Sequence, residues 1–266
     1  MNFLVAFGVR AAVVRKAQGR PSSLVGRRGA NSVRGSAVRA TRDRSMRTLR
    51  SGLVTLLAVW LAACASGPPP ADWQLDARAA LERAQQAYLS GDGRIEELEF
   101  ARVRSEIART GRADLLARAE LARCATRVAS LVFEPCAGFD AWQAEAAAPE
   151  RAYARYLLGQ AGPQDVALPP QHRPLVAAAA GGAALATIDD PLARLVGAGV
   201  LLRSGHADAQ AVALAVDAAS GQGWRRPLLA WLGVQARMAE QDSDSAARAR
   251  IERRIRLVGG APDPGP

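Results

Sequence analysis

From residue 72 onward, the apolar positions of this chain recur with the period of an α-helix. Phe100, Val103 and Ile107, for example, are spaced at i, i+3 and i+7, which places them on one helix face. No segment shows the sustained alternation of apolar and polar residues that is typical of a half-buried strand. The pattern predicts an all-α fold, with helices over residues 72–90, 95–110, 114–133, 139–147, 150–158, 175–185, 191–204, 207–219, 228–240 and 243–258.

The turns between these helices are short and rich in glycine, so we expect consecutive helices to pack as antiparallel hairpins. Asp190 followed by Pro191 is a strong start signal, because Asp caps a helix and Pro suits its first position. Residues 87–92 (AYLSGD) and 201–206 (LLRSGH) resemble the end of the first helix of a tetratricopeptide repeat, although no strict repeat period holds. The resemblance implies a tetratricopeptide-like stack of hairpins, and a compact bundle is the alternative.

The segment 114–133 is apolar on two sides, which predicts a helix sandwiched between neighbours at the centre of the N-terminal half. One side carries Leu115, Ala119, Ala122, Ala129 and Phe133, and the other Leu121, Cys124, Val128 and Leu131.

The predicted helices fall into two regions, 72–158 and 175–258. The stretch 159–174 between them has four prolines and two glycines and is the expected linker, and residues 259–266 are an expected disordered tail.

A short apolar run lies ahead of the helices. Residues 52–65 carry no charge, follow a positive segment that opens at Met46, and precede a proline-rich stretch. Such a run is shorter than the roughly 20 residues that a membrane-spanning helix needs. Positive start, apolar middle and small-residue end are typical of a secretory signal, here over residues 46–63.

The end of this run, Leu61-Ala62-Ala63-Cys64, resembles the lipobox of bacterial lipoproteins. The resemblance implies cleavage before Cys64, acylation of that cysteine and anchoring of the chain to a membrane on its periplasmic side. Ala65, and not Asp, follows the cysteine, which in lipoproteins favours the outer membrane. Residues 64–71 would then form a flexible tether. The alternative is an A-x-A site over residues 63–65 for ordinary signal peptidase, which would release a soluble periplasmic protein.

Residues 1–45 are rich in Arg, Ser and Gly, and we interpret them as a mis-assigned start or a disordered leader. They bias the charge of the whole chain, which is +10. Residues 1–63 hold 12 of the 35 basic residues and one of the 25 acidic ones, which leaves the remainder with a net charge of −1. We therefore expect no nucleic-acid partner. Every basic residue after Lys16 is arginine, and we give that preference no functional weight.

Cys124 and Cys136 are the two other cysteines, and an even pair in an oxidising periplasm predicts a disulfide. The turn forced by Glu134-Pro135 gives the chain room to return. Two buried free thiols are the alternative, and a redox pair is less favoured because the C-x-x-C spacing is missing.

Few residues offer catalytic or metal chemistry. His172 and His206, the only histidines, are expected in solvated turns. Glu96, Glu97 and Glu99 are expected on a solvated helix face that favours the helix dipole. We expect no cofactor and no metal site. Four tryptophans are expected in the core and not in a ligand platform: Trp73, Trp142, Trp224 and Trp231.

These features favour a non-enzymatic, membrane-anchored lipoprotein whose helical domain binds or scaffolds other envelope proteins. Two alternatives stay open: an envelope enzyme that acts on wall polymer or lipid through carboxylates in a cleft, and a carrier of an apolar ligand between helices.

Overall fold

The computed structural model describes residues 69–176 and 181–260, and over these residues it is helical with no strand. The predicted all-α class is therefore confirmed. Cys64, the predicted signal peptide and most of the predicted tether lie outside the described residues, as does most of the tail.

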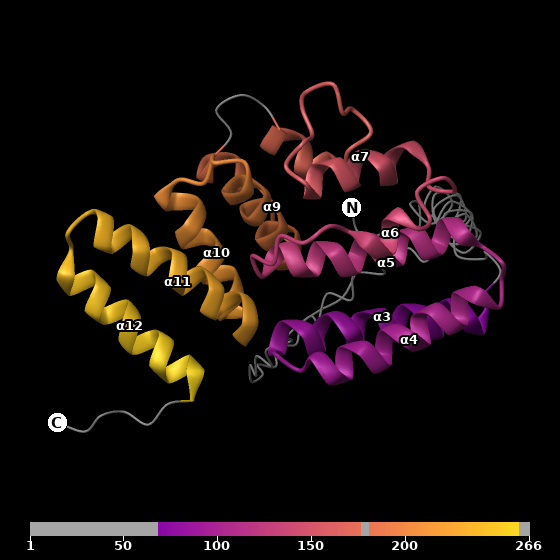
Figure 1. The fold of residues 1–266 in the computed structure, drawn as a ribbon, viewed down its shortest axis with the longest axis horizontal. Coiled ribbons are helices and arrows are strands. Elements are labelled where there is room, and N and C mark those ends of the chain that lie inside the picture. Colours follow the sequence, from indigo (N-terminus) through magenta and orange to yellow (C-terminus); the bar gives the residue numbers. More distant parts are fainter. Residues whose placement is uncertain (1–68, 177–180, 261–266) are drawn as a thin grey trace, which may run out of the picture. The chain divides into compact units, whose positions relative to one another are not determined.

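Two helical hairpins are the first and last pairs of helices in the described chain (Figure 1). The first pairs α3 (Asp72–Ser90) with α4 (Gly93–Ala108), and the last pairs α11 (Arg225–Gln241) with α12 (Ser245–Gly259). Gly91 ends α3 in the left-handed conformation, at φ 103°, which glycine adopts without steric cost. The carboxylate of Asp92 then caps α4 by accepting a hydrogen bond from the amide of Ile95.

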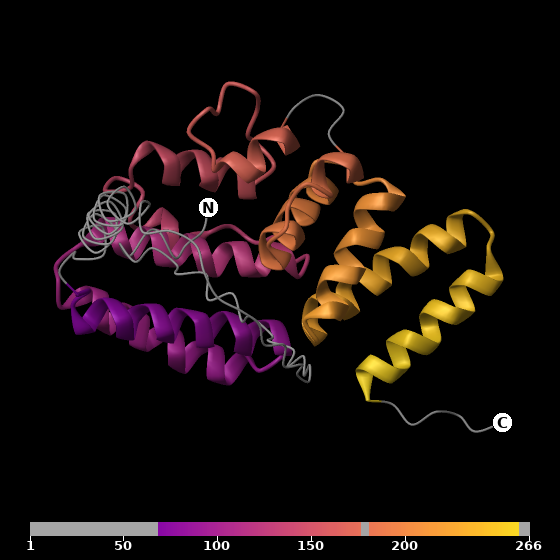
Figure 2. The same cartoon turned by 180° about the vertical axis from the view of Figure 1, so that it is seen from behind.

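Helix α5 (Ala113–Ala129) lies between the α3–α4 hairpin and the helices that follow it, as both views show (Figures 1 and 2). Its neighbours include α6 (Ala137–Asp140), α7 (Ala148–Leu157) and α9 (Pro191–Arg203). The prediction of a helix sandwiched on two sides is confirmed.

The two sides of α5 belong to different apolar clusters. Leu115, Ala119 and Ala122 pack with α3 and α4, whereas Leu121 and Val128 belong to the larger core of the later helices. Two residues predicted on the first apolar side of this helix do not pack with the others of that side. Ala129 belongs to the larger core, and Phe133 is exposed because α5 ends at Ala129 instead of continuing to residue 133.

Helix α9 crosses α5 closely where Gly199 meets Val128. A Cβ on Gly199 would overlap the carbonyl oxygen of Val128, so only glycine lets the two backbones approach this far. Asp190 caps α9 by accepting a hydrogen bond from the amide of Ala193 at 2.7 Å, which confirms the predicted start signal. After α9, α10 (Ala209–Gly221) connects to the last hairpin.

Helix α11 also contacts α3, which precedes it by more than a hundred residues. The guanidinium of Arg226 donates to the carbonyl oxygens of Tyr88 and Gly91, and the indole of Trp224 donates to Gln86. In a repeat solenoid each repeat contacts only its neighbours. The contact between α3 and α11 therefore favours a compact bundle over a tetratricopeptide-like stack.

The predicted helix 139–147 is much shorter than expected, because it is the single turn of α6 followed by turns. Of the predicted helix 175–185, residues 177–180 lie outside the described residues. The parts on either side are the end of a 3-10 helix, η1 (Pro170–Val176), and the one-turn α8 (Gly182–Leu185). The amide of Gly182, the first residue of α8, donates to the carboxylate of Asp208.

The segment 159–174 contributes to the core. Leu168 and His172 are both buried, and the larger apolar cluster takes residues from helices on either side of the segment. This stretch therefore packs against the helices that it connects.

Of the four tryptophans expected in the core, Trp224 and Trp231 are buried, whereas Trp73 and Trp142 are half-buried.

Candidate functional site

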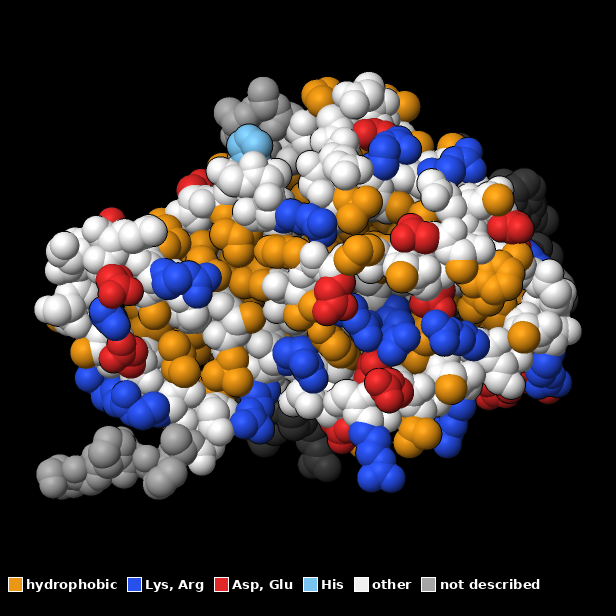
Figure 3. Space-filling view, in the orientation of Figure 1, with side chains coloured by type: hydrophobic (Ala, Val, Ile, Leu, Met, Phe, Trp, Pro, Cys, Tyr) orange, Lys and Arg blue, Asp and Glu red, His pale blue; other side chains and the backbone are white. Residues whose placement is uncertain are grey.

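A groove of about 190 Å³ lies where α4, α5 and the chain leading into α6 meet. In Figure 3, basic and acidic side chains gather over the region that α4 and α5 occupy in Figure 1. We call this site the arginine groove, and its lining is Arg104, Glu120, Arg123, Cys124, Arg127, Glu134, Pro135, Cys136, Ala137 and Gly138.

Glu120 on α5 is the buried acid of the groove, with 4% of its surface exposed. The guanidinium of Arg104 on α4 binds its carboxylate through Nε at 2.7 Å and Nη2 at 2.6 Å. Gly138 makes room for this pair, because a Cβ at that position would overlap the carboxylate of Glu120. The side chain of Arg104 remains half-exposed, so within this ion pair only Glu120 is buried.

Arg123 on α5 binds Glu96 on α4. Its Nε and Nη2 donate to the two carboxylate oxygens at 2.6 and 3.1 Å, and its guanidinium stacks on Phe100 at 4.7 Å from the ring centroid. The hydrogen bond to Glu96 raises the pKa of Arg123 and so keeps its guanidinium charged.

The prediction that Glu96 lies on a solvated face is therefore wrong. Glu96 is buried because it stands one turn before Phe100, on the face of α4 that packs on α3 and α5. Glu97 is exposed as expected. Glu99 is half-buried and pairs with Arg83 and Arg102.

Arg127 is the more loosely paired arginine of the groove. Its shortest ion-pair distance, to Glu96, is 3.6 Å, and its Nη1 donates a long hydrogen bond of 3.4 Å to the carbonyl oxygen of Arg123. Its guanidinium stacks on the buried ring of Tyr88 at 5.0 Å, and Arg226 stacks on the same ring at 4.3 Å. The contact with Tyr88 thus holds Arg127 in place without occupying all the N–H donors of its guanidinium.

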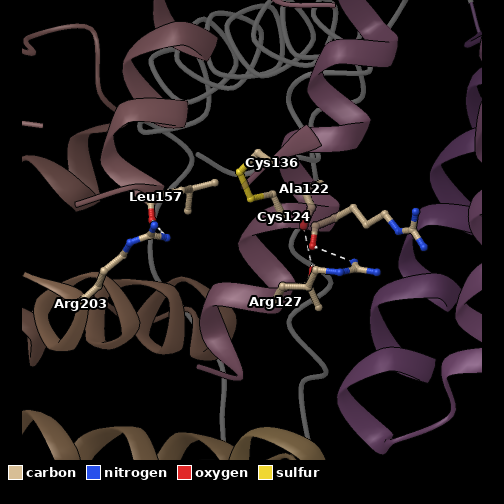
Figure 4. The surroundings of a disulfide bond; sticks show 8 residues. Ala122, Cys124, Arg127, Cys136, Leu157 and Arg203 are labelled. Atoms are coloured by element: carbon tan, nitrogen blue, oxygen red, sulfur yellow. Dashed lines mark hydrogen bonds between the residues drawn. A yellow bond between two sulfur atoms is a disulfide. The ribbon is translucent and has the colours of Figure 1, made fainter. Parts of the chain in front are cut away.

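The disulfide between Cys124 and Cys136 forms one wall of the groove (Figure 4). The two Cα atoms are 5.6 Å apart, so the predicted pair lies at the distance that a disulfide requires. To return to Cys136, the chain leaves α5 at Ser130 and passes through Leu131 at φ 60°, a conformation that side-chain-bearing residues seldom adopt. The disulfide therefore holds the loop that carries Glu134 and Pro135 against α5.

His172 does not lie in a solvated turn, and this prediction is wrong. It is 1% exposed, and its Nδ1 lies 3.1 Å from the hydroxyl of Tyr156, which is itself fully buried. Burial lowers the pKa of His172 to about 3, so the ring is neutral at physiological pH. The rings of Tyr153 and Tyr156 lie against the imidazole, at 5.7 and 4.8 Å between centroids. His206 is exposed in a turn, as expected.

A smaller pocket of about 110 Å³ lies in the later part of the chain, lined by apolar residues together with Tyr156, Ser204 and His206. His206 Nδ1 is 3.1 Å from Ser204 Oγ, but that hydroxyl donates to the carbonyl oxygen of Val200 at 2.9 Å. The serine is therefore not activated as a nucleophile. The pocket is small and partly polar, which does not favour the apolar-carrier alternative.

The envelope-enzyme alternative needs a carboxyl group that is free to exchange a proton. Glu96 and Glu120, the buried acids beside the groove, are each bound by an arginine. Within residues 69–176 and 181–260, no group of three or more metal-ligating side chains comes together. Nor does any helix there have the length and apolarity needed to cross a bilayer.

Comparisons with models of known protein families, with curated proteins and with solved structures found no match to this chain. The fold and the site therefore define the protein only as an all-α chain of helical hairpins with an arginine groove on α4 and α5.

Sequence reasoning missed the groove, although one signal for it was present. Glu120 and Arg123 interrupt a helix that is otherwise apolar on two sides, and buried charges occur mainly in pairs. The pairing partners, Arg104 and Glu96, lie on a different helix, which the sequence pattern does not identify.

Proposed function

We propose that this chain is a lipid-anchored envelope protein whose helical domain binds another protein through the arginine groove. The anchor rests on the lipobox-like sequence at Cys64. The binding function rests on the groove, which presents three guanidinium groups beside a disulfide-held loop. Arginine is enriched in protein interfaces, and a fixed side chain loses less entropy on binding than a mobile one.

The groove is built in advance of binding. Arg104 and Arg123 are held by buried carboxylates, Arg127 by the ring of Tyr88, and the wall by the disulfide. Preorganised polar groups of this kind favour recognition of a specific partner. The alternatives of an envelope enzyme and an apolar-ligand carrier find less support in the paired acids and the small second pocket.

Photo-crosslinking in producing cells tests the binding function. A photoreactive amino acid at Ala137, which is exposed and lines the groove, is expected to give one discrete adduct with an exported protein. The same residue at Leu257 on α12, which is 78% exposed, serves as the control and should not give that adduct. Identical adducts from both positions, or none from Ala137, would contradict the proposal.

A further inference from the structure

The donors of Arg127 point to a specific ligand group. We infer that Arg127 binds a carboxylate, supplied by an acidic side chain of the partner polypeptide. This inference rests on the proposed function and adds the chemistry by which the groove recognises its partner.

Arg127 differs from its neighbours in what already binds it. Arg104 and Arg123 hold carboxylates at 2.6 Å, whereas the one ion pair of Arg127 among the described residues is with Glu96 at 3.6 Å. Glu96 is already bound on both oxygens by Arg123. A second carboxylate could therefore form the short hydrogen bonds with Arg127 that Glu96 does not.

The position of Arg127 is set before a ligand arrives. The guanidinium of Arg127 lies over the ring of Tyr88, and its one hydrogen bond among the described residues is the long one to Arg123, so its other N–H groups can bind an acceptor. Tyr88 is buried and is also held by Arg226, so the platform itself is fixed by contacts with α11. A guanidinium held in this way suits bidentate binding of a carboxylate.

The other walls suit the stem of an acidic side chain. The disulfide, Pro135, Ala137 and Gly138 bring apolar or small groups to the groove. Its volume of about 190 Å³ is below the roughly 300 Å³ at which sites for whole small molecules begin. The groove is therefore of a size for one or two side chains of a larger partner.

The charges of the groove favour a single carboxylate over a polyanion. Glu120 and Glu134 line it together with the three arginines, which leaves an excess of one positive charge, the amount that a single carboxylate balances. The sequence from residue 64 onward has a net charge of −1, which adds no long-range attraction for nucleic acid or an anionic lipid surface. A carboxylate on a polypeptide matches this balance.

NMR titration of the full chain carrying Cys64→Ser tests the inference. The probes are the blocked tripeptide Gly-Glu-Gly and its Gly-Gln-Gly counterpart, and the signal is the side-chain Nε–H resonance of Arg127. We expect the Glu peptide to shift this resonance and to bind about tenfold more tightly than the Gln peptide. Equal binding of the two peptides would overturn the inference without any need for a variant.

Two variants separate the role of Arg127 from folding. Arg127→Gln should weaken binding of the Glu peptide about tenfold, whereas Arg127→Lys, which keeps the charge but not the fork, should weaken it less. Arg248→Gln, on the exposed face of α12, is the matched control and should bind as the wild type does. Equal losses in Arg127→Gln and Arg248→Gln would contradict the inference.

Competition distinguishes the possible sources of negative charge. Inorganic phosphate or phosphatidylglycerol vesicles, added at constant ionic strength, should displace the Glu peptide poorly. Displacement as effective as that by free Glu peptide would overturn the carboxylate assignment. If the peptide titration fails while the Ala137 adduct is still found, the proposed binding function is supported and the carboxylate inference is wrong. If the Glu peptide binds but no adduct forms at Ala137, the proposed protein partner is contradicted.

Discussion

The indole N–H of Trp231 donates a hydrogen bond to the carbonyl oxygen of Ala129, 3.1 Å away and 102 residues earlier in the chain. Ala129 is the last residue of α5, where helical carbonyls have no partner within the helix. Trp231 is fully buried on α11. One side chain therefore caps the central helix and ties the last hairpin to it.

We expect Trp231→Phe to lower the free energy of unfolding by about 2–4 kcal/mol. The variant leaves the carbonyl oxygen of Ala129 without its donor and opens a gap in a packed core. Urea denaturation measures the change. Trp142→Phe, at a half-buried position, is the control and should cost less; an equal loss would show that the link between Trp231 and Ala129 contributes little.

The disulfide should stabilise the folded chain. In a Cys64→Ser background, reduction of the Cys124–Cys136 bond is expected to lower the free energy of unfolding by about 2–4 kcal/mol. A thiol assay on the unfolded, non-reduced protein should find no free cysteine. Two titratable thiols in that assay would contradict the pairing.

The buried pair of Glu120 and Arg104 should respond unequally to loss of each partner. Arg104→Gln leaves a buried carboxylate without its cation, and we expect a loss of about 3–5 kcal/mol. Glu120→Gln leaves Arg104 half-exposed and able to reach water, so a smaller loss of about 1–3 kcal/mol is expected.

Urea denaturation of the two variants gives the order. Glu134→Gln, which removes an exposed acid of the same groove, is the control and should change stability by less than either. The reverse order, with Glu120→Gln the more damaging, would mean that the carboxylate is not buried as described.

His172 should make stability depend on pH. The folded state keeps the ring neutral, with its pKa lowered to about 3 by burial, whereas the unfolded chain takes up a proton below about pH 6.5. Stability is therefore expected to fall as pH drops from about 6.5 towards 3. At pH 5 the loss relative to pH 7 amounts to about 2 kcal/mol.

Denaturation of His172→Gln and His206→Gln at pH 7 and pH 5 isolates this effect. The first variant should lose most of the histidine contribution to the pH dependence, because the imidazole whose pKa differs between the folded and unfolded chain is removed. The second removes an exposed histidine and should keep the wild-type dependence. A pH dependence unchanged by His172→Gln would contradict the account of that residue.

Local signals predicted much of this fold, because they act within a few residues. The turn at Gly91, the cap at Asp190 and the two apolar sides of α5 each follow from neighbouring residues, and the structure confirms them. The disulfide followed from cysteine count and a single turn.

Contacts between distant residues account for what the sequence did not predict. His172 is buried because Tyr156 and the core receive it, and Glu96 is buried because Arg123, 27 residues later, pairs with it. The arginine groove consists of such contacts. The sequence shows that these residues are charged, but which of them form ion pairs depends on how α4 packs on α5.

The proposal that the helical domain meets its partner at a membrane surface depends on Cys64, which lies outside the described residues. Mass spectrometry of the protein recovered from bacterial membranes tests it most directly. We predict a chain that begins at Cys64, with a diacylglyceryl group on the sulfur and an acyl chain on the amino group. A chain that retains residues upstream of Cys64, or that carries an unmodified thiol there, would contradict the account.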